Sequence, residues 1–168
     1  MRALWKLTLI GAKLYLREPV AAFFTIVYAP MMLILFGSIY GNDPSPFFGG
    51  RGAMDISVPS YIGVIIVTVG LMSVPIGVAS RREAGVLRRY QATPLHPAIY
   101  LTADVLVYFG MTLSGVVLLI LTGKICYNVR FDGNVVNVLL GFSLGAFSFF
   151  ALGFLIAALA PTARIAQT

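Results

Sequence analysis

Four long apolar runs divide the chain, and they cover residues 20–40, 59–80, 98–123 and 135–160. Each run is at least as long as the roughly 20 residues that a helix needs to cross the hydrocarbon layer of a membrane. Apolar positions are continuous within each run, whereas the strands of a membrane barrel alternate and need only about ten residues each. The pattern therefore predicts an all-α, polytopic transmembrane bundle. Asp104 is the only charged residue within these runs.

A different pattern precedes the first run. The cations between residues 2 and 17 recur with a helical period and fall within a sector of roughly 60°; they are Arg2, Lys6, Lys13 and Arg17. The Glu18-Pro19 pair then ends the segment, because the residue before a proline is driven out of the helical region. We expect residues 1–18 to form an amphipathic helix in the headgroup layer, with Trp5, Lys6, Lys13 and Arg17 at the interface. This helix either only anchors the first span or also rests against a cytoplasmic partner.

Composition supports a membrane protein. Hydrophobic residues make up 59% of the chain and charged residues 11%, with a mean hydropathy of +0.92, whereas a soluble domain carries about 25% charged residues. The net charge of +6 comes from short clusters between apolar runs, which argues against nucleic acid as a partner. Cys126 and His96 are the only cysteine and histidine, so we expect no intrachain disulfide and no metal site.

The cations also predict the orientation. Four Lys or Arg residues precede the first run, four lie in residues 81–97 and one follows the fourth run, nine in all, against three in the other two connections. By the positive-inside rule, the N-terminus and residues 81–97 are expected in the cytoplasm. The first run is too long for the apolar core of a signal peptide, so we expect it to remain as a span.

Residues 81–97 form the most informative loop. Interpreted as a short helix from Arg81 to Ala92, it has a basic face of four arginines, which are Arg81, Arg82, Arg88 and Arg89. Glu83, Val86 and Tyr90 share the opposite face, with Leu87 beside them. This face either dips into the membrane interface or docks into a groove of a soluble partner, with Glu83 meeting a cation. The residues alone leave both interpretations open.

Several motifs occur in a fixed order. Arg17-Glu18-Pro19 precedes the first span, residues 82–89 read Arg-Glu-Ala-Gly-Val-Leu-Arg-Arg, residues 92–95 read Ala-Thr-Pro-Leu, and residues 161–164 read Pro-Thr-Ala-Arg. In this order they resemble the type-2 permease family of ATP-binding cassette (ABC) transporters, which includes bacterial drug and polysaccharide exporters. The loop departs from the family in having Arg81-Arg82 where a second acid is frequent and Val86 where a hydroxyl residue is usual. That family has six spans, so we expect this single transmembrane domain to lack two further C-terminal spans.

The resemblance implies a role for the loop. In the family it is the coupling helix that contacts the ATPase subunit, and here it comprises Glu83, Gly85, Val86, Leu87, Arg88, Arg89, Tyr90 and Pro94. The implied partners are a nucleotide-binding ATPase, which holds ATP and Mg²⁺, and a second permease copy. The implied function is export of a drug-like, lipid-like or saccharide substrate across the bacterial inner membrane.

Asp104 is the main polar feature of the spans. A carboxylate within the bilayer is costly and marks a functional site by default. Tyr100 and Tyr108, one turn away on either side, offer hydrogen bonds, and the position is only roughly 10 Å into the span. We therefore expect either a solvated, tyrosine-paired side chain or a residue of the substrate pathway.

The sequence gives weaker support to other function classes. A phosphate-binding loop is absent, since Gly123-Lys124 is followed by Ile125, so we expect no ATPase activity in this chain. A secondary, ion-coupled transporter is the alternative, although the loop lacks the acid at Arg81 and the glycine at Ala84 that its gating motif requires. An intramembrane enzyme would need paired ionisable groups, and Asp104 stands alone in the sequence pattern. A structural assembly subunit is the remaining alternative.

Overall fold

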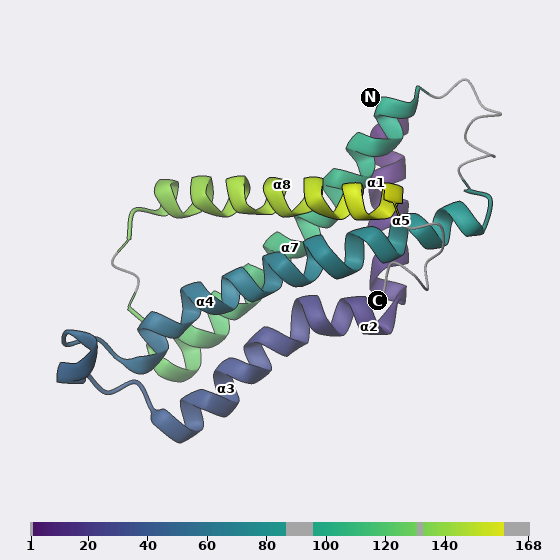
Figure 1. Cartoon of the computed structure of the whole chain (residues 1–168). Coiled ribbons are helices and arrows are strands. Elements are labelled where there is room, and N and C mark those ends of the chain that lie inside the picture. Colours follow the sequence, from purple (N-terminus) through teal and green to yellow (C-terminus); the bar gives the residue numbers. More distant parts are fainter. Residues whose placement is uncertain (1, 87–95, 131–132, 160–168) are drawn as a thin grey trace.

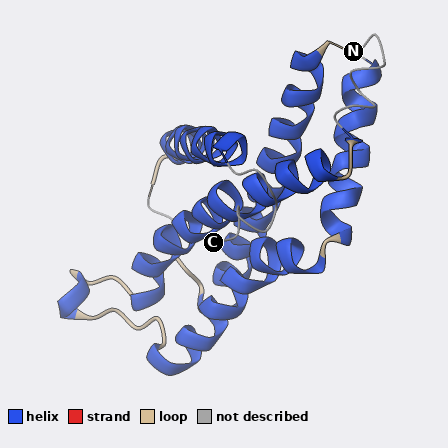
Figure 2. Ribbon diagram, turned by 45° about the vertical axis from the view of Figure 1, so that its right-hand side comes forward, coloured by secondary structure: helices blue, strands red, loops and turns tan. Residues whose placement is uncertain are grey.

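The computed structural model describes residues 2–86, 96–130 and 133–159. Within these ranges the chain is helical, and the only β pairing is an isolated bridge between Ser45 and Arg51. Figure 2 shows helices joined by short loops and no strand. The expected all-α bundle is therefore confirmed.

One N-terminal helix precedes four spans in the described part of the chain. Helix α1 covers Arg2–Arg17. The described helices include four that are long and apolar enough to cross a membrane, at Pro19–Tyr40, Ala53–Glu83, Ala98–Tyr127 and Val135–Leu159. The first span consists of α2 (Pro19–Ala22), the π-helical turn η1 (Phe23–Val27) and α3 (Tyr28–Tyr40). The second consists of α4 (Ala53–Thr68), the π-helical turn η3 (Val69–Ser73) and α5 (Val74–Glu83), and the third and fourth are α7 (Pro97–Tyr127) and α8 (Val135–Leu159).

Two of these spans are longer than the apolar runs. The second begins at Ala53 instead of 59, and α7 ends at Tyr127 instead of 123. Polar side chains explain both ends. Asn42 Oδ1 accepts hydrogen bonds from the backbone N–H groups of Met54 and Asp55, while Asn42 Nδ2 donates to the Tyr127 carbonyl oxygen at 3.1 Å. These hydrogen bonds satisfy backbone N–H and C=O groups that have no partner within the helix at its ends. A hydropathy pattern contains no information about such bonds.

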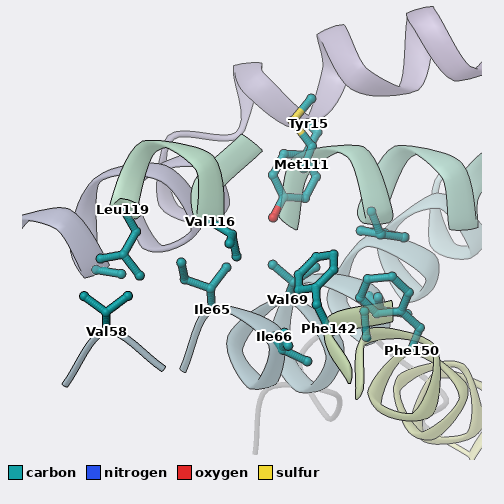
Figure 3. Close-up of a cluster of buried hydrophobic side chains, with 14 of the residues drawn as sticks. Tyr15, Val58, Ile65, Ile66, Val69, Met111, Val116, Leu119, Phe142 and Phe150 are labelled. Carbon is teal, nitrogen blue, oxygen red and sulfur yellow. The ribbon is translucent and has the colours of Figure 1, made fainter. Parts of the chain in front are cut away.

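The helices share one apolar core. It includes Ile65, Val69, Leu119 and Phe150, each at most 1% exposed, and Figure 3 shows them between the second, third and fourth spans. Large apolar side chains remain exposed along the outer faces of the spans, as expected for surfaces whose solvent is lipid. Helix α1 packs against α7 at the end of the bundle where α5 also ends (Figure 1).

The π-helical turns of the first two spans share one construction. Each lies shortly before a proline, Pro30 or Pro75, which has no N–H to donate to a carbonyl in the preceding turn. Thr25 and Gly70 lie five residues before these prolines. A π-helical hydrogen bond links a carbonyl oxygen to the N–H five residues later, so the prolines leave the Thr25 and Gly70 carbonyl oxygens without that donor. A glycine of another helix packs directly on each of these two carbonyl oxygens: Gly115 of α7 on Thr25, and Gly153 of α8 on Gly70. Each π turn is thus a point of close approach between two spans.

Candidate functional site

An ion pair joins the second and third spans beside the loop of residues 84–96. Arg81, in the last turn of α5, donates from Nη1 to Asp104 Oδ1 of α7 at 2.8 Å. Asp104 is 4% exposed, and the Arg81 side chain is 27% exposed. Hydrogen bonds between charged groups are strong, and a carboxylate this deep in the bundle requires such a partner. Asp104 is therefore paired, and the expectation that it stands alone is wrong.

Arg81 is held by three further contacts. Its Nε donates to the Gly77 carbonyl oxygen at 3.1 Å, and its Nη2 donates to the Tyr108 hydroxyl at 3.1 Å. Its guanidinium carbon lies 5.8 Å from the centre of the Tyr100 ring, within the range of a cation–π interaction. Tyr100 and Tyr108, the two tyrosines expected to stabilise Asp104, thus both contact Arg81.

Tyr15 connects this cluster to α1 and the first span. Its hydroxyl lies 2.7 Å from Thr25 Oγ1 and donates to Ser73 Oγ at 3.1 Å. Its ring packs edge-on against Tyr108, with ring centroids 5.9 Å apart. Thr25 and Ser73 belong to the two π-helical turns. Burial raises the pKa of the Tyr15 hydroxyl, which therefore stays protonated and able to donate.

We call these residues the base cluster: Tyr15, Thr25, Ser73, Arg81, Tyr100, Asp104 and Tyr108. It joins α1 to the first three spans through hydrogen bonds, an ion pair and ring contacts. Arg82 extends the connection to the fourth span, because its Nη1 donates to the Ala157 carbonyl oxygen of α8 at 3.2 Å. All five long helical segments are therefore tied together at one end of the bundle.

The comparison with known families identifies the chain. A family model described as ABC-2 family transporter protein matches residues 49–168. The chain belongs to the ABC-2 transporter family. It is thus a multi-pass membrane component of a transporter, and the resemblance seen in the sequence is confirmed. No curated protein and no solved structure matches the chain.

In this ABC-2 protein the predicted loop helix does not begin at Arg81. Arg81 and Arg82 end the second span, and the helix stops after Glu83. Gly85 has φ +68°, and its N–H donates to the Arg82 carbonyl oxygen at 3.1 Å. This left-handed residue ends the helix in the way that glycine does at many helix C-termini. The prediction of one unbroken helix that begins at Arg81 is therefore wrong, and Glu83 and Val86 do not share one helical face.

The other predicted site residues have the following positions. Trp5, Lys6, Lys13 and Arg17 are exposed on α1, as expected for an interfacial helix. Tyr15, on the same helix, is buried in the base cluster and forms hydrogen bonds there, and the sequence pattern did not single it out. Glu83 is exposed at the end of α5 and Val86 is half-buried. The remaining docking residues, Leu87, Arg88, Arg89, Tyr90 and Pro94, lie outside the described residues.

The chemistry of the base cluster is that of a structural link. A guanidinium does not give up its proton in proteins, so Arg81 is no acid–base partner for Asp104. Within the described ranges, no group of three or more His, Cys, Asp or Glu side chains is placed to hold a metal ion. The sequence did contain a signal for the ion pair. Arg81 and Asp104 carry opposite charges on either side of one loop, and consecutive antiparallel spans bring such positions to the same level.

Proposed function

We propose that this chain is the permease subunit of an ABC exporter and that a separate ATPase subunit docks on residues 81–97. The observation that carries the proposal is the ion pair between Arg81 and Asp104. The pair joins α5 and α7, the helices that flank residues 84–96, so a force applied between them acts on both helices together. Docking itself is carried by Glu83 and by the segment after it, including Leu87 and Tyr90.

The base cluster then distributes the movement. Tyr108 and Ser73 connect the ion pair to Tyr15 of α1, and Tyr15 connects it to Thr25 of the first span. ATP-driven closure of the two partner ATPases pushes on residues 81–97, and the four spans rotate as one unit between inward-open and outward-open arrangements. ATP and Mg²⁺ are bound by the partner subunit, and the permease acts with a second copy of itself or with a related chain.

The proposed orientation places the base cluster at the cytoplasmic side of the bacterial inner membrane. Nine cations belong to that side and three to the other. The cytoplasmic side is where an ATPase finds its nucleotide. The substrate leaves the cytoplasm, and its class is drug-like, lipid-like or saccharide, as in the exporters that the family includes.

The test separates docking from coupling. The chain is co-expressed with a candidate nucleotide-binding ATPase subunit, and association and permease-stimulated ATP hydrolysis are measured on the purified complex in lipid vesicles. Glu83→Arg combined with Tyr90→Ala should abolish association. Arg81→Gln should leave association intact and reduce the stimulated ATPase rate about tenfold, whereas Lys124→Gln, at the other end of α7, should change neither.

Two outcomes would refute the proposal. If the Glu83 and Tyr90 double variant still associates and still stimulates hydrolysis, residues 81–97 are not the docking segment. If Arg81→Gln retains full stimulation, the ion pair does not transmit the movement. Charge exchange by Arg81→Asp with Asp104→Arg serves as the positive control, because it restores an ion pair between the same two helices.

A further inference from the structure

A cavity with an aromatic lining opens at the end of the bundle opposite the base cluster. Its volume is about 460 Å³, which is within the usual range for small-molecule sites. It lies between the end of α3, the short 3₁₀ helix η2 (Pro46–Phe48) and the first turns of α4. Figure 1 shows this connection far from the helix ends at α1 and α5. The side chains relevant here are Phe36, Tyr40, Phe48, Tyr61, Asp43 and Ser57.

The rings come from three different elements, and three of the four residues are exposed. Phe36 and Tyr40 lie one turn apart on α3, with ring centroids 6.4 Å apart and an angle of 18° between the planes. They are 38% and 68% exposed, and Phe48 is 44% exposed. The face of an aromatic ring carries partial negative charge, so it attracts a cation that approaches within about 6 Å of its centre.

Asp43 gives the cavity its charge. It is the only acidic residue in the lining, which contains no Lys or Arg. No ion pair engages its carboxylate within the described part of the chain. Asp55, the other acid among the described residues at this end, is already used, since its carboxylate accepts hydrogen bonds from Asn42 Nδ2 and from the backbone N–H groups of Gly52 and Arg130. The carboxylate that lines the cavity is thus the one available to a ligand.

A belt of aromatic residues at the membrane surface is the simplest alternative explanation. Such a belt explains tyrosines at headgroup level, but it does not explain why four rings and a single carboxylate line one cavity. A second cavity at this end is lined by two cations, Arg51 and Arg130, and by one acid, Asp55. The formal charge of its lining is therefore positive, whereas that of the aromatic cavity is negative.

We infer that the cavity formed by Phe36, Tyr40, Phe48, Tyr61 and Asp43 binds a monovalent organic cation with apolar substituents. The matching chemistry is a quaternary ammonium group, whose alkyl arms contact the rings while its charge faces the carboxylate. The group belongs either to a free amphiphilic cation or to a choline lipid headgroup. This site does not depend on the proposed coupling to an ATPase.

The test uses the whole chain, purified in an uncharged maltoside detergent without ATPase or nucleotide. Tetraethylammonium is titrated calorimetrically, and 3-ethyl-3-pentanol serves as a neutral ligand of similar shape. Tetraethylammonium should bind saturably and the alcohol should not. Asp43→Asn should weaken binding about fivefold, and Phe36→Leu or Tyr40→Leu about two- to fivefold. Tyr40→Phe keeps the ring and should bind as the unmodified chain does.

Further outcomes decide the inference and the source of the cation. Equal binding of the alcohol, unchanged binding by Asp43→Asn, or no saturable heat with tetraethylammonium would overturn the site. Asp43 and Tyr40 are exposed, so their variants should elute as the unmodified chain does and keep its helicity. Displacement by added phosphatidylcholine, but not by phosphatidylglycerol, assigns the site to a headgroup, and its absence assigns it to a free cation. A negative result would leave the transport proposal unaffected, since no transport is measured.

Discussion

At the scale of single residues, Arg81 and Asp104 depend on each other. A buried charge loses its hydration, and removing one partner of a buried pair leaves the other uncompensated. Asp104→Ala should therefore lower the free energy of unfolding by about 3 kcal/mol, because Asp104 is 4% exposed and Arg81 would lose its carboxylate. The measurement is unfolding of the purified chain in mixed detergent, followed by the loss of helicity.

The same experiment distinguishes a paired charge from a merely polar position. Replacing both partners, by Arg81→Met with Asp104→Leu, should bring stability to within about 1 kcal/mol of the unmodified chain, since apolar side chains of similar volume replace a buried pair at little cost. Lys124→Met, which removes an exposed cation from the same helix, should change stability by less than about 0.5 kcal/mol. Equal effects of Asp104→Ala and Lys124→Met would mean that the ion pair contributes nothing.

At the scale of the elements, the π-helical turns depend on the glycines that face them. Gly115 is buried against the Thr25 carbonyl oxygen, so a methyl group there would push α7 away from the first span. Gly115→Ala should destabilise the chain by about 2 kcal/mol through overpacking. Gly110→Ala, five residues earlier in α7, meets open space and should be neutral or stabilising by up to about 1 kcal/mol, because alanine is the better helix former.

Thr25 also contacts Tyr15, so the Gly115 variant has a second expected effect. Displacing the Thr25 backbone should separate its hydroxyl from Tyr15 and loosen α1 from the bundle. Proteolysis between α1 and the first span, near Glu18, should then become faster in Gly115→Ala and remain unchanged in Gly110→Ala. Identical stability and cleavage in the two variants would show that the close approach at Thr25 is not required.

Elements also show what the sequence could and could not predict. The spans and α1 were predictable because length, hydropathy and the period of the cations depend only on nearby residues. Their ends were not, because the start of the second span depends on Asn42 and its end on the left-handed conformation of Gly85. The pair between Arg81 and Asp104 requires two spans to lie side by side. The opposite charges of Arg81 and Asp104 on either side of one loop were visible in the sequence, but Arg81 was assigned to the loop helix, whereas it lies in the last turn of α5.

At the scale of the whole molecule, the cation pattern and the base cluster favour the same orientation. The cations of α1 and those in the last turn of α5, which are expected in the cytoplasm, lie at the same end of the bundle (Figure 1). Tyr127, at the end of α7, accepts a hydrogen bond from Asn42 at the end of the bundle opposite the base cluster. The two ends of the bundle are therefore built from different residues. A probe that reports on one end therefore reports on the orientation of the entire bundle.

Cys126 is such a probe, because it is the only cysteine and is exposed next to Tyr127. If the N-terminus is cytoplasmic, a membrane-impermeant maleimide should label Cys126 from outside intact spheroplasts. In a matched variant with Cys126→Ser and Arg17→Cys, the thiol lies at the other end, on exposed α1, and should be labelled only after the membrane is permeabilised. The opposite result for both chains would invert the orientation, and residues 81–97 would then face away from any cytoplasmic ATPase. The coupling proposal would fail with it, whereas the cation cavity would remain testable, because its binding assay does not depend on orientation.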